Sequence, residues 1–309
     1  MDILLQQIIN GLVAGSIYAL VALGYTMVYG ILGLINFAHG EVVMFGAMIA
    51  LSVIQLLFGS GVALPPAVII GLGLAAAIPS CMLLGYTIER VAYRPLRHAP
   101  RLAPLITAIG MSIVLQNVAM MIWGRRYIPF PALLPVNTHP LGGAVITDLQ
   151  IFIVLLALLL MASLEWLVQR TSLGRAMRAT SQNPAIAGLM GINVNTIISI
   201  TFVIGSALAA VAGVMVSAYY GIAHYYMGFM LGLKAFTAAV LGGIGNLRGA
   251  MVGGVLLGLI ESLGAGYIGD LTGGVLGSNY QDVFAFFVLI LVLIFRPTGL
   301  LGERIADRA

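Results

Sequence analysis

Six stretches of this sequence are apolar for about the length that a helix needs to cross a lipid bilayer. A helix that crosses a hydrocarbon core of about 30 Å requires roughly 20 mostly apolar residues. Strands of a membrane barrel would instead alternate between apolar and polar residues in segments of about ten. The sequence shows no such alternation, so we expect helices. The six stretches are 8–32, 67–88, 102–123, 149–168, 193–217 and 281–295.

Composition places the chain in the same class. Hydrophobic residues make up 61% and charged residues 8% of the sequence, whereas soluble domains are roughly half apolar and a quarter charged. A soluble fold could not bury this much apolar surface. We therefore expect an all-α, polytopic membrane helix bundle that forms a single transmembrane domain over residues 1–309.

Arginines gather between the apolar stretches, so the net charge of +4 indicates topology and does not indicate nucleic-acid binding. Segments 89–101 and 169–192 are rich in arginine, and cytoplasmic loops of membrane proteins are enriched in basic residues. Both segments are expected inside, and the two spans between them agree with that. The C-terminus is also expected to be cytoplasmic, with the N-terminus outside if 8–32 crosses. Arg296, Arg304 and Arg308 support this orientation, and Arg125, Arg126 and Lys234 are exceptions.

Alternation between the two sides requires three further spans, at about 41–58, 229–244 and 249–265. That gives nine crossings, and eight to ten transmembrane or re-entrant helices is the expected range. Glycines and polar residues at 33–41 and 219–246 could interrupt helices there. Broken helices are tolerated at membrane depth only where they face protein or a water-filled cavity, so these two regions are the candidates for function.

The first candidate region contains Asn36, His39 and Glu41 at the junction of two apolar stretches. Polar and ionisable groups at membrane depth usually face the bundle interior, a partner or a transport pathway. The alternative is an interfacial turn between two helices, where polar side chains carry no energetic penalty. If the first helix continued through this region, one of its faces would be polar or lined by glycine. That face would include Tyr18, Tyr25, Tyr29, Gly33, Asn36 and Gly40.

The second candidate region is rich in glycine. Gly245, Gly249 and Gly253 repeat at intervals of four residues, a small-residue pattern that lets transmembrane helices approach closely. Helix packing is therefore the favoured interpretation of these glycines. Asn246 and Glu261 are the polar groups of functional interest there. Both candidate regions combine glycines, Ile-Asn and a following apolar helix, which indicates a possible internal repeat.

The arginine-rich segment 169–192 should contain a short helix. Asn183 suits the N-cap and Pro184 the first turn of such a helix, and Gly191 suits its C-terminal end. The residues between them are mostly apolar. A short apolar helix in a cytoplasmic loop is expected to contact a partner protein, and the alternative is that it lies in the lipid headgroup layer.

No pattern of a soluble enzyme is present. The only lysine, Lys234, is not part of a phosphate-binding loop, the four histidines and Cys81 lack the spacing of metal ligands, and no segment resembles a nucleophile elbow. We therefore expect neither catalysis nor a cofactor in this chain. A channel or secondary transporter that works without partners remains an alternative, because buried polar groups and repeats are natural there too.

Several motifs together resemble one family. They are Ile-Tyr-Ala-Leu-Val-Ala-Leu-Gly-Tyr at 17–25, Gly-Leu-Ile-Asn-Phe-Ala-His-Gly-Glu at 33–41, the segment 174–192, Gly-Gly-Ile-Gly-Asn-Leu-Arg-Gly at 242–249 and Arg-Pro-Thr-Gly-Leu at 296–300. The sequence is similar in these motifs, and over essentially its whole length, to the branched-chain amino-acid ABC importer permeases of the LivH type.

The resemblance implies an inner-membrane subunit that pairs with a homologous second permease, two cytoplasmic ATP-binding subunits and a periplasmic amino-acid-binding protein. ATP would bind only to the partner subunits. Leucine, isoleucine or valine would enter by alternating access. Relatives of such permeases also serve urea or short-chain amides, which leaves the same architecture with those substrates as an alternative.

The resemblance also suggests roles for particular residues. Segment 169–192 corresponds to the part that couples to an ATPase, although Ala-Thr-Ser at 179–181 departs from the Glu-Ala-Ala of many importers. Its candidate coupling residues are Arg175, Arg178, Asn183, Pro184, Gly188 and Gly191. The candidate residues of the substrate pathway are Asn36, His39, Glu41, Asn246 and Glu261.

Overall fold

The computed structural model describes residues 2–60, 64–97, 99–100, 102–132, 137–273 and 280–302. Three arginines used in the orientation argument, Arg101, Arg304 and Arg308, lie outside the described residues.

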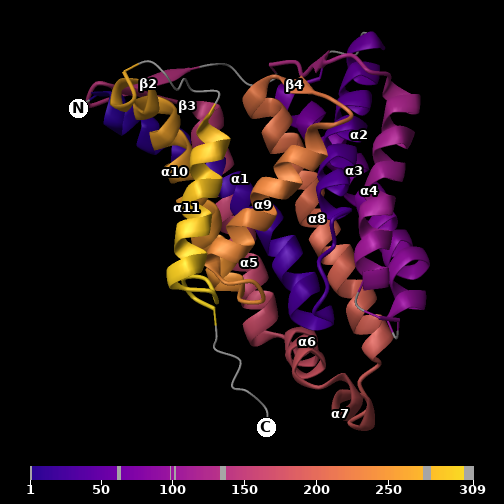
Figure 1. Cartoon of the computed structure of the whole chain (residues 1–309). Coiled ribbons are helices and arrows are strands. Elements are labelled where there is room, and N and C mark those ends of the chain that lie inside the picture. The colour runs from indigo at the N-terminus through magenta and orange to yellow at the C-terminus, as the bar shows by residue number, and fades with distance from the viewer. Residues whose placement is uncertain are drawn as a thin grey trace. The chain divides into compact units, whose positions relative to one another are not determined.

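Helices dominate the described residues, as predicted (Figure 1). Seven of them are long and apolar enough to cross a membrane, and α9 and α11 are shorter apolar helices. Each of the nine expected spans coincides with a helix, so the prediction of a polytopic helical membrane protein is confirmed. The nine helices are α1 (Asp2–Leu32), α2 (His39–Gly59), α3 (Pro66–Ile88), α4 (Leu102–Trp123), α5 (Asp148–Arg170), α8 (Val194–Tyr220), α9 (Met227–Gly242), α10 (Leu247–Leu271) and α11 (Gln281–Phe295).

Shorter elements connect these helices. A π-helix, η1 (Glu89–Tyr93), and a 3-10 turn, η2 (Arg94–Leu96), extend α3, and α6 (Ser172–Gln182) and α7 (Pro184–Leu189) follow α5. Strands β2 (Thr138–Leu141) and β3 (Ala144–Thr147) form an antiparallel hairpin. Its turn residues, Gly142 and Gly143, both have positive φ. A second antiparallel pair joins β1 (Ile128–Pro129) to β4 (Ile222–Ala223).

The chain divides into two compact units. One consists of Met1–Thr26, Val136–Ala162 and Lys234–Ala309, and the other consists of Met27–Pro135 and Ser163–Leu233. We call them the terminal unit and the central unit. The proposal of a single transmembrane domain over 1–309 stays a prediction.

In the central unit, α2, α3 and α8 pack together at small residues. A Cβ at Gly46 of α2 would lie 2.5 Å from the Cα of Ala210 in α8, and a Cβ at Gly213 would lie 3.0 Å from the backbone nitrogen of Ala47. No real Cβ tolerates the first of these distances. The close approach of the two backbones therefore requires glycine, which is the usual way that helices associate where lipid removes the hydrophobic driving force.

In the terminal unit, α10 packs on α1 and α9 through glycines. A Cβ at Gly11 or Gly15 of α1 would lie 2.8 Å from the Cα of Leu259 or Val255 in α10. Gly249 and Gly253, both in α10, face α9 so closely that a Cβ would collide with the α9 backbone.

Gly245 lies outside the helix that the four-residue repeat predicted. It has a φ of 95° and belongs to the turn before α10. The positive φ favours glycine at this position, so the repeat in the sequence combines one turn glycine with two packing glycines.

The first helix ends before the first candidate region. Leu32 is its last residue, and Gly33 follows with a φ of 63°. The helix does not continue through this region, because the six residues 33–38 separate α1 from α2, so the face from Tyr18 to Gly40 that a continuous helix would present does not form. The expected interruption of the helix at 33–41 is confirmed.

Candidate functional site

The polar residues between α1 and α2 are buried in the central unit. Asn36 and His39 are each 2% exposed, and Glu41 is fully buried. The hydroxyl of Tyr93, in the π-helix η1, donates to Oδ1 of Asn36 over 3.0 Å. Tyr93 in turn packs against Phe202 of α8, with ring centroids 5.3 Å apart. These side chains are thus enclosed by protein, unlike the free polar groups of an interfacial turn.

Glu41, in the first turn of α2, is held by two neutral donors from α4. Its Oε1 accepts a hydrogen bond from the hydroxyl of Ser112 over 2.9 Å and from the amide of Gln116 over 2.7 Å. Its Oε2 is buried and has no hydrogen-bond partner among the described residues. A Cβ at Gly228 of α9 would lie only 2.8 Å from this oxygen. Because glycine has no side chain, the carboxylate of Glu41 fits against α9 at this position.

Ser112 and Gln116 were missed by the sequence analysis. They lie four residues apart in a mostly apolar helix, and Gln116 also donates to Ser112 over 3.3 Å. Residues at this spacing share one helix face. A paired polar position within a span was therefore the signal that could have identified them as partners of a buried carboxylate.

The terminal unit contains a buried cluster of charges. Lys234 of α9 pairs with Glu261 of α10 and, at 2.8 Å, with Asp282 of α11. The ammonium group also lies 5.7 Å from the centre of the Tyr18 ring of α1, within the range of a cation–π interaction. The cluster thus joins four helices. It also explains why Lys234 is an exception to the charge distribution, since the ammonium is neutralised inside the bundle.

The side chain of Asn246 forms hydrogen bonds within and next to the turn before α10. Its Oδ1 accepts from the backbone N–H of Gly249 over 3.1 Å, and its amide donates to the carbonyl of Leu301 over 2.9 Å. The first contact caps the start of α10. The second holds the C-terminal segment to this turn.

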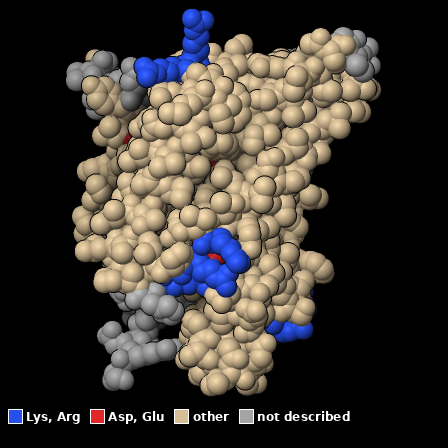
Figure 2. Space-filling view, turned by 90° about the vertical axis from the view of Figure 1, so that its right-hand side faces the viewer, with Lys and Arg blue, Asp and Glu red and all other residues tan. Residues whose placement is uncertain are grey.

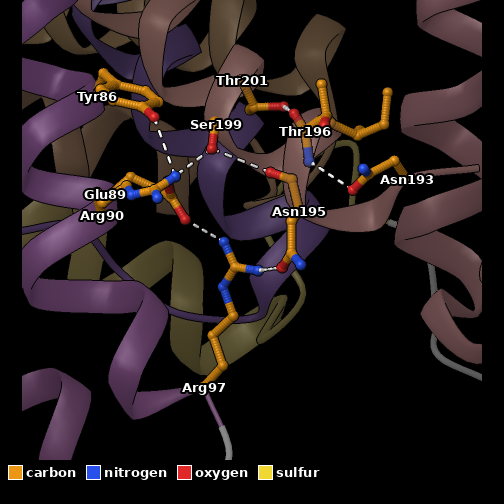
Figure 3. A network of polar contacts seen from close by, with 10 residues as sticks. Tyr86, Glu89, Arg90, Arg97, Asn193, Asn195, Thr196, Ser199 and Thr201 are labelled. Carbon is orange, nitrogen blue, oxygen red and sulfur yellow. Dashed lines mark hydrogen bonds and ion pairs between the residues drawn. The ribbon is translucent and has the colours of Figure 1, made fainter.

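A third buried acid, Glu89, was not predicted. It is the first residue of η1 and is fully buried. The guanidinium of Arg97 pairs with its Oε1, and the hydroxyl of Ser199 donates to its Oε2 over 2.7 Å. Arg97 also donates to Oδ1 of Asn195 over 2.5 Å. Figure 3 shows this network linking the end of α3 to the start of α8.

Burial shapes the electrostatics of that network. Desolvation lowers the pKa of Arg97, while the carboxylate of Glu89 opposes the shift. In this ion pair each group supplies the counter-charge that burial of the other requires. Figure 2 shows basic side chains gathered around a carboxylate on a face that is otherwise mostly uncharged.

The short helix expected in segment 169–192 is present as α7. Oδ1 of Asn183 accepts from the backbone N–H groups of Ala185 and Ile186 over 3.1 Å each, and Pro184 is the first helical residue. The helix ends before Gly191, whose φ is 84°. The predicted N-cap and helix start are confirmed.

Preceding it, α6 lies against the end of α5. The side chain of Arg178 donates to the carbonyl of Val168, and a Cβ at Gly174 would collide with the same carbonyl. Arg175, in contrast, is exposed. These contacts hold α6 against α5 within the central unit.

The outer surface of α7 is apolar. Ile186 is 57% exposed, Leu189 87% and Met190 79%. Gly188 lies between them, and a Cβ added there would meet no atom within 4 Å. Exposed apolar groups of this kind, gathered on one short element, mark a contact surface for protein or membrane.

Metal-ligand clusters are not found in the described part of the chain, where no three His, Cys, Asp or Glu residues are placed to hold an ion. Three acids, Glu41, Glu89 and Glu261, are buried in the described part of the chain. Each acid lies where two or more helices meet.

Comparison with known proteins gives a consistent result. Residues 7–293 match the family described as branched-chain amino acid transport system / permease component. The chain is 51% identical to the high-affinity branched-chain amino acid transport system permease protein BraD of Pseudomonas aeruginosa, over 97% of this chain and 96% of that protein. It is 46% identical to the corresponding permease protein LivH of Escherichia coli, with the same coverage. A probable permease of this type from Methanocaldococcus jannaschii is 27% identical over 96% of this chain and 92% of its own length.

Proposed function

This chain belongs to the permease component family of branched-chain amino acid transport systems, and on that premise we propose that it carries leucine, isoleucine and valine into the cytoplasm. It would do so as the membrane subunit of a binding-protein-dependent ABC importer. The observation that carries this proposal is the similarity over nearly the full length of relatives named for that transport.

The energy for transport would come from other subunits. A permease subunit is not itself an ATPase, and we propose that two cytoplasmic ATP-binding subunits, a homologous second permease and a periplasmic binding protein complete the assembly. The exposed apolar side chains of α7, held in place by the Asn183 cap, support its role as the surface that contacts an ATP-binding subunit. Arg175 of α6 is exposed and would contribute to the same contact, and Arg178, which donates to the carbonyl of Val168, would help α6 to transmit its movement to α5.

The proposed orientation places α6, α7 and the C-terminus in the cytoplasm of a bacterial cell and the protein in its inner membrane. The clustering of arginines in segments 89–101 and 169–192 supports it. The pairing of Lys234 with Glu261 and Asp282 removes one of the exceptions, because a neutralised ammonium does not act as a loop charge.

Transport would proceed by alternating access, with buried polar groups along the route. Among the candidates Asn36, His39, Glu41, Asn246 and Glu261, we propose Glu41 as the principal pathway residue. Its carboxylate is fully buried and forms no ion pair among the described residues, and an acceptor without a counter-charge suits the ammonium group of an amino acid. Asn36 and His39 would support the same region, and Glu261 and Asn246 would act through the helices of the terminal unit.

The experiment that tests the function is uptake of radiolabelled leucine into proteoliposomes that contain the chain with its co-purified subunits, loaded binding protein outside and ATP inside. We expect uptake that requires ATP and is competed by isoleucine and valine. Uptake without ATP, by the chain alone, would refute the importer proposal. Competition by urea or acetamide in place of the branched-chain amino acids would refute the substrate assignment.

Two variants test the residue roles in the same assay. Glu41→Gln keeps one oxygen that accepts from Ser112 and Gln116 and replaces the other with a neutral NH2 group, so we expect normal assembly and at least a ten-fold lower uptake. Leu189→Asp should leave the isolated chain intact and abolish co-purification of the ATP-binding subunits, because a charge at this contact would be desolvated without a partner. Uptake at the wild-type rate in Glu41→Gln would remove Glu41 from the pathway.

A further inference from the structure

A pocket of about 350 Å³ lies in the central unit between the end of α3 and the start of α8. Arg90 and Arg94 line it from the helical extension of α3, and Asn195 and Ser199 line it from the first turns of α8. Figure 3 shows three of these residues around the Glu89 network. This pocket is separate from Glu41 and from α7, so the proposed transport function does not use it.

The pocket carries unneutralised positive charge. Glu89, the acid beside it, is already occupied by Arg97 and Ser199. The side chain of Arg90 lies over the Tyr86 ring and donates to the Tyr86 hydroxyl over 3.2 Å. No acid of the described residues forms an ion pair with Arg90 or Arg94. Two guanidinium groups thus remain available to an anion.

The other wall of the pocket is apolar. Ile200 and Val203 of α8 and the ring of Tyr86 form this wall, and the polar residues Asn193 and Thr196 also line the pocket. On the same helical segment, Leu83 of α3 is 67% exposed and Val91 of η1 is 63% exposed. A ligand that fits this site would therefore carry an anionic head and an apolar body.

The position along the helix agrees with such a ligand. The helical segment Pro66–Leu96 has 31 residues, which corresponds to about 46 Å at 1.5 Å per residue. The hydrocarbon core of a bilayer is only about 30 Å thick. Arg90 and Arg94 lie near the far end of this segment, so they reach the headgroup layer while the preceding apolar turns stay in the hydrocarbon.

We propose that this pocket binds the phosphate group of an anionic phospholipid, whose acyl chains lie along the exposed apolar face of α3. The planar guanidinium matches phosphate with two parallel hydrogen bonds, and basic pockets between transmembrane helices on the cytoplasmic side bind anionic headgroups. An acidic segment of a partner protein would satisfy the two arginines equally well. It would leave the adjoining apolar wall without a function, and the lipid accounts for both.

The test compares two variants of the full-length chain that lose the same charge. Arg90→Gln/Arg94→Gln removes the pocket arginines. Arg125→Gln/Arg126→Gln removes two exposed arginines elsewhere in the central unit and serves as the matched control. Both are purified in mild detergent, checked by size-exclusion chromatography, and titrated with phosphatidylglycerol, phosphatidylcholine or inorganic phosphate while bound lipid is counted by native mass spectrometry.

We expect wild type and control to retain phosphatidylglycerol in preference to phosphatidylcholine and the pocket variant to bind it at least ten-fold more weakly. Arg90→Lys/Arg94→Lys should recover part of the binding, which distinguishes lost charge from lost folding. Equal losses in pocket variant and control would overturn the proposal, since they would show a general effect of net charge. Displacement of the lipid by millimolar inorganic phosphate would overturn the assignment to a lipid, and unchanged lipid binding together with lost ATP-binding subunits would assign the pocket to a protein partner.

Discussion

Removal of the Glu89 carboxylate should destabilise the central unit more than any exposed substitution. In Glu89→Ala the guanidinium of Arg97 keeps its contact with Asn195 but loses its counter-charge, although its side chain is only 12% exposed. Ser199 loses its acceptor as well. Removing one partner of a buried ion pair costs about 3–5 kcal/mol, because the remaining charge is buried without compensation. We expect the free energy of unfolding to fall by an amount in that range.

The double variant separates this explanation from a simple loss of packing. Glu89→Ala/Arg97→Ala removes both charges, so its destabilisation should be smaller than the sum of the two single effects by about 2 kcal/mol, within the range measured for coupled residues. Glu89→Gln should lie between wild type and Glu89→Ala, since it keeps an acceptor for Ser199.

Cys81 provides the assay. It is the only cysteine and is fully buried in α3, so a thiol-reactive fluorescent dye reports its exposure during thermal unfolding in detergent. Arg175→Ala, at an exposed position, is the control for a lost surface charge and should unfold at the wild-type temperature. Strict additivity of the two single variants would refute the ion-pair explanation and leave packing as the cause.

Three further predictions use the same unfolding assay or hydrogen exchange. Gly46→Ala should destabilise the chain by about 1–3 kcal/mol, because its Cβ would collide with the α8 backbone. Gly71→Ala is the control and should have no such effect, because a Cβ added at Gly71 would meet no atom within 4 Å. Equal unfolding temperatures of the two variants would refute this. Lys234→Met should lower the free energy of unfolding by about 3–5 kcal/mol, because it leaves two carboxylates without their cation. Lys234→Arg should retain most of the wild-type stability. A Lys234→Met variant as stable as wild type would contradict the importance of the cluster. Asn183→Ala removes the α7 cap at a cost of about 1 kcal/mol, so exchange of the backbone amides of 185–189 should become about five-fold faster. Unchanged exchange would show that the cap does not hold the helix.

The spans could be predicted from the sequence because each depends on local composition alone. A helix in lipid must satisfy its own backbone hydrogen bonds over about 20 apolar residues, and that requirement is visible without knowledge of any partner. The start of α7 was predictable for a similar reason. Asn183 and Pro184 act on the backbone of the next three residues, so the whole motif is contained in the adjacent sequence.

The ion pairs were beyond local reasoning. Ser199 lies 110 residues from Glu89 in the sequence, and nothing in either segment specifies the other. The polar face that a continuous first helix would have does not form, because Gly33, with positive φ, follows the last residue of a helix whose sequence periodicity continues through Asn36. Gly245 shows the same limit, since turn glycines and packing glycines are identical in the sequence and differ only in φ and in what a Cβ would meet.

The three buried acids are all glutamates, so only the side chains that contact them distinguish their functions. Glu89 is neutralised by Arg97, and Glu261 by Lys234, so each contributes to holding helices together and its removal exposes a cation. Glu41 has only the neutral donors of Ser112 and Gln116 and one oxygen without a partner in the described structure. A carboxylate in that position costs stability unless something else supplies a counter-charge. A passing substrate ammonium is such a counter-charge, and this is the reason to place the pathway at Glu41 ahead of the other two.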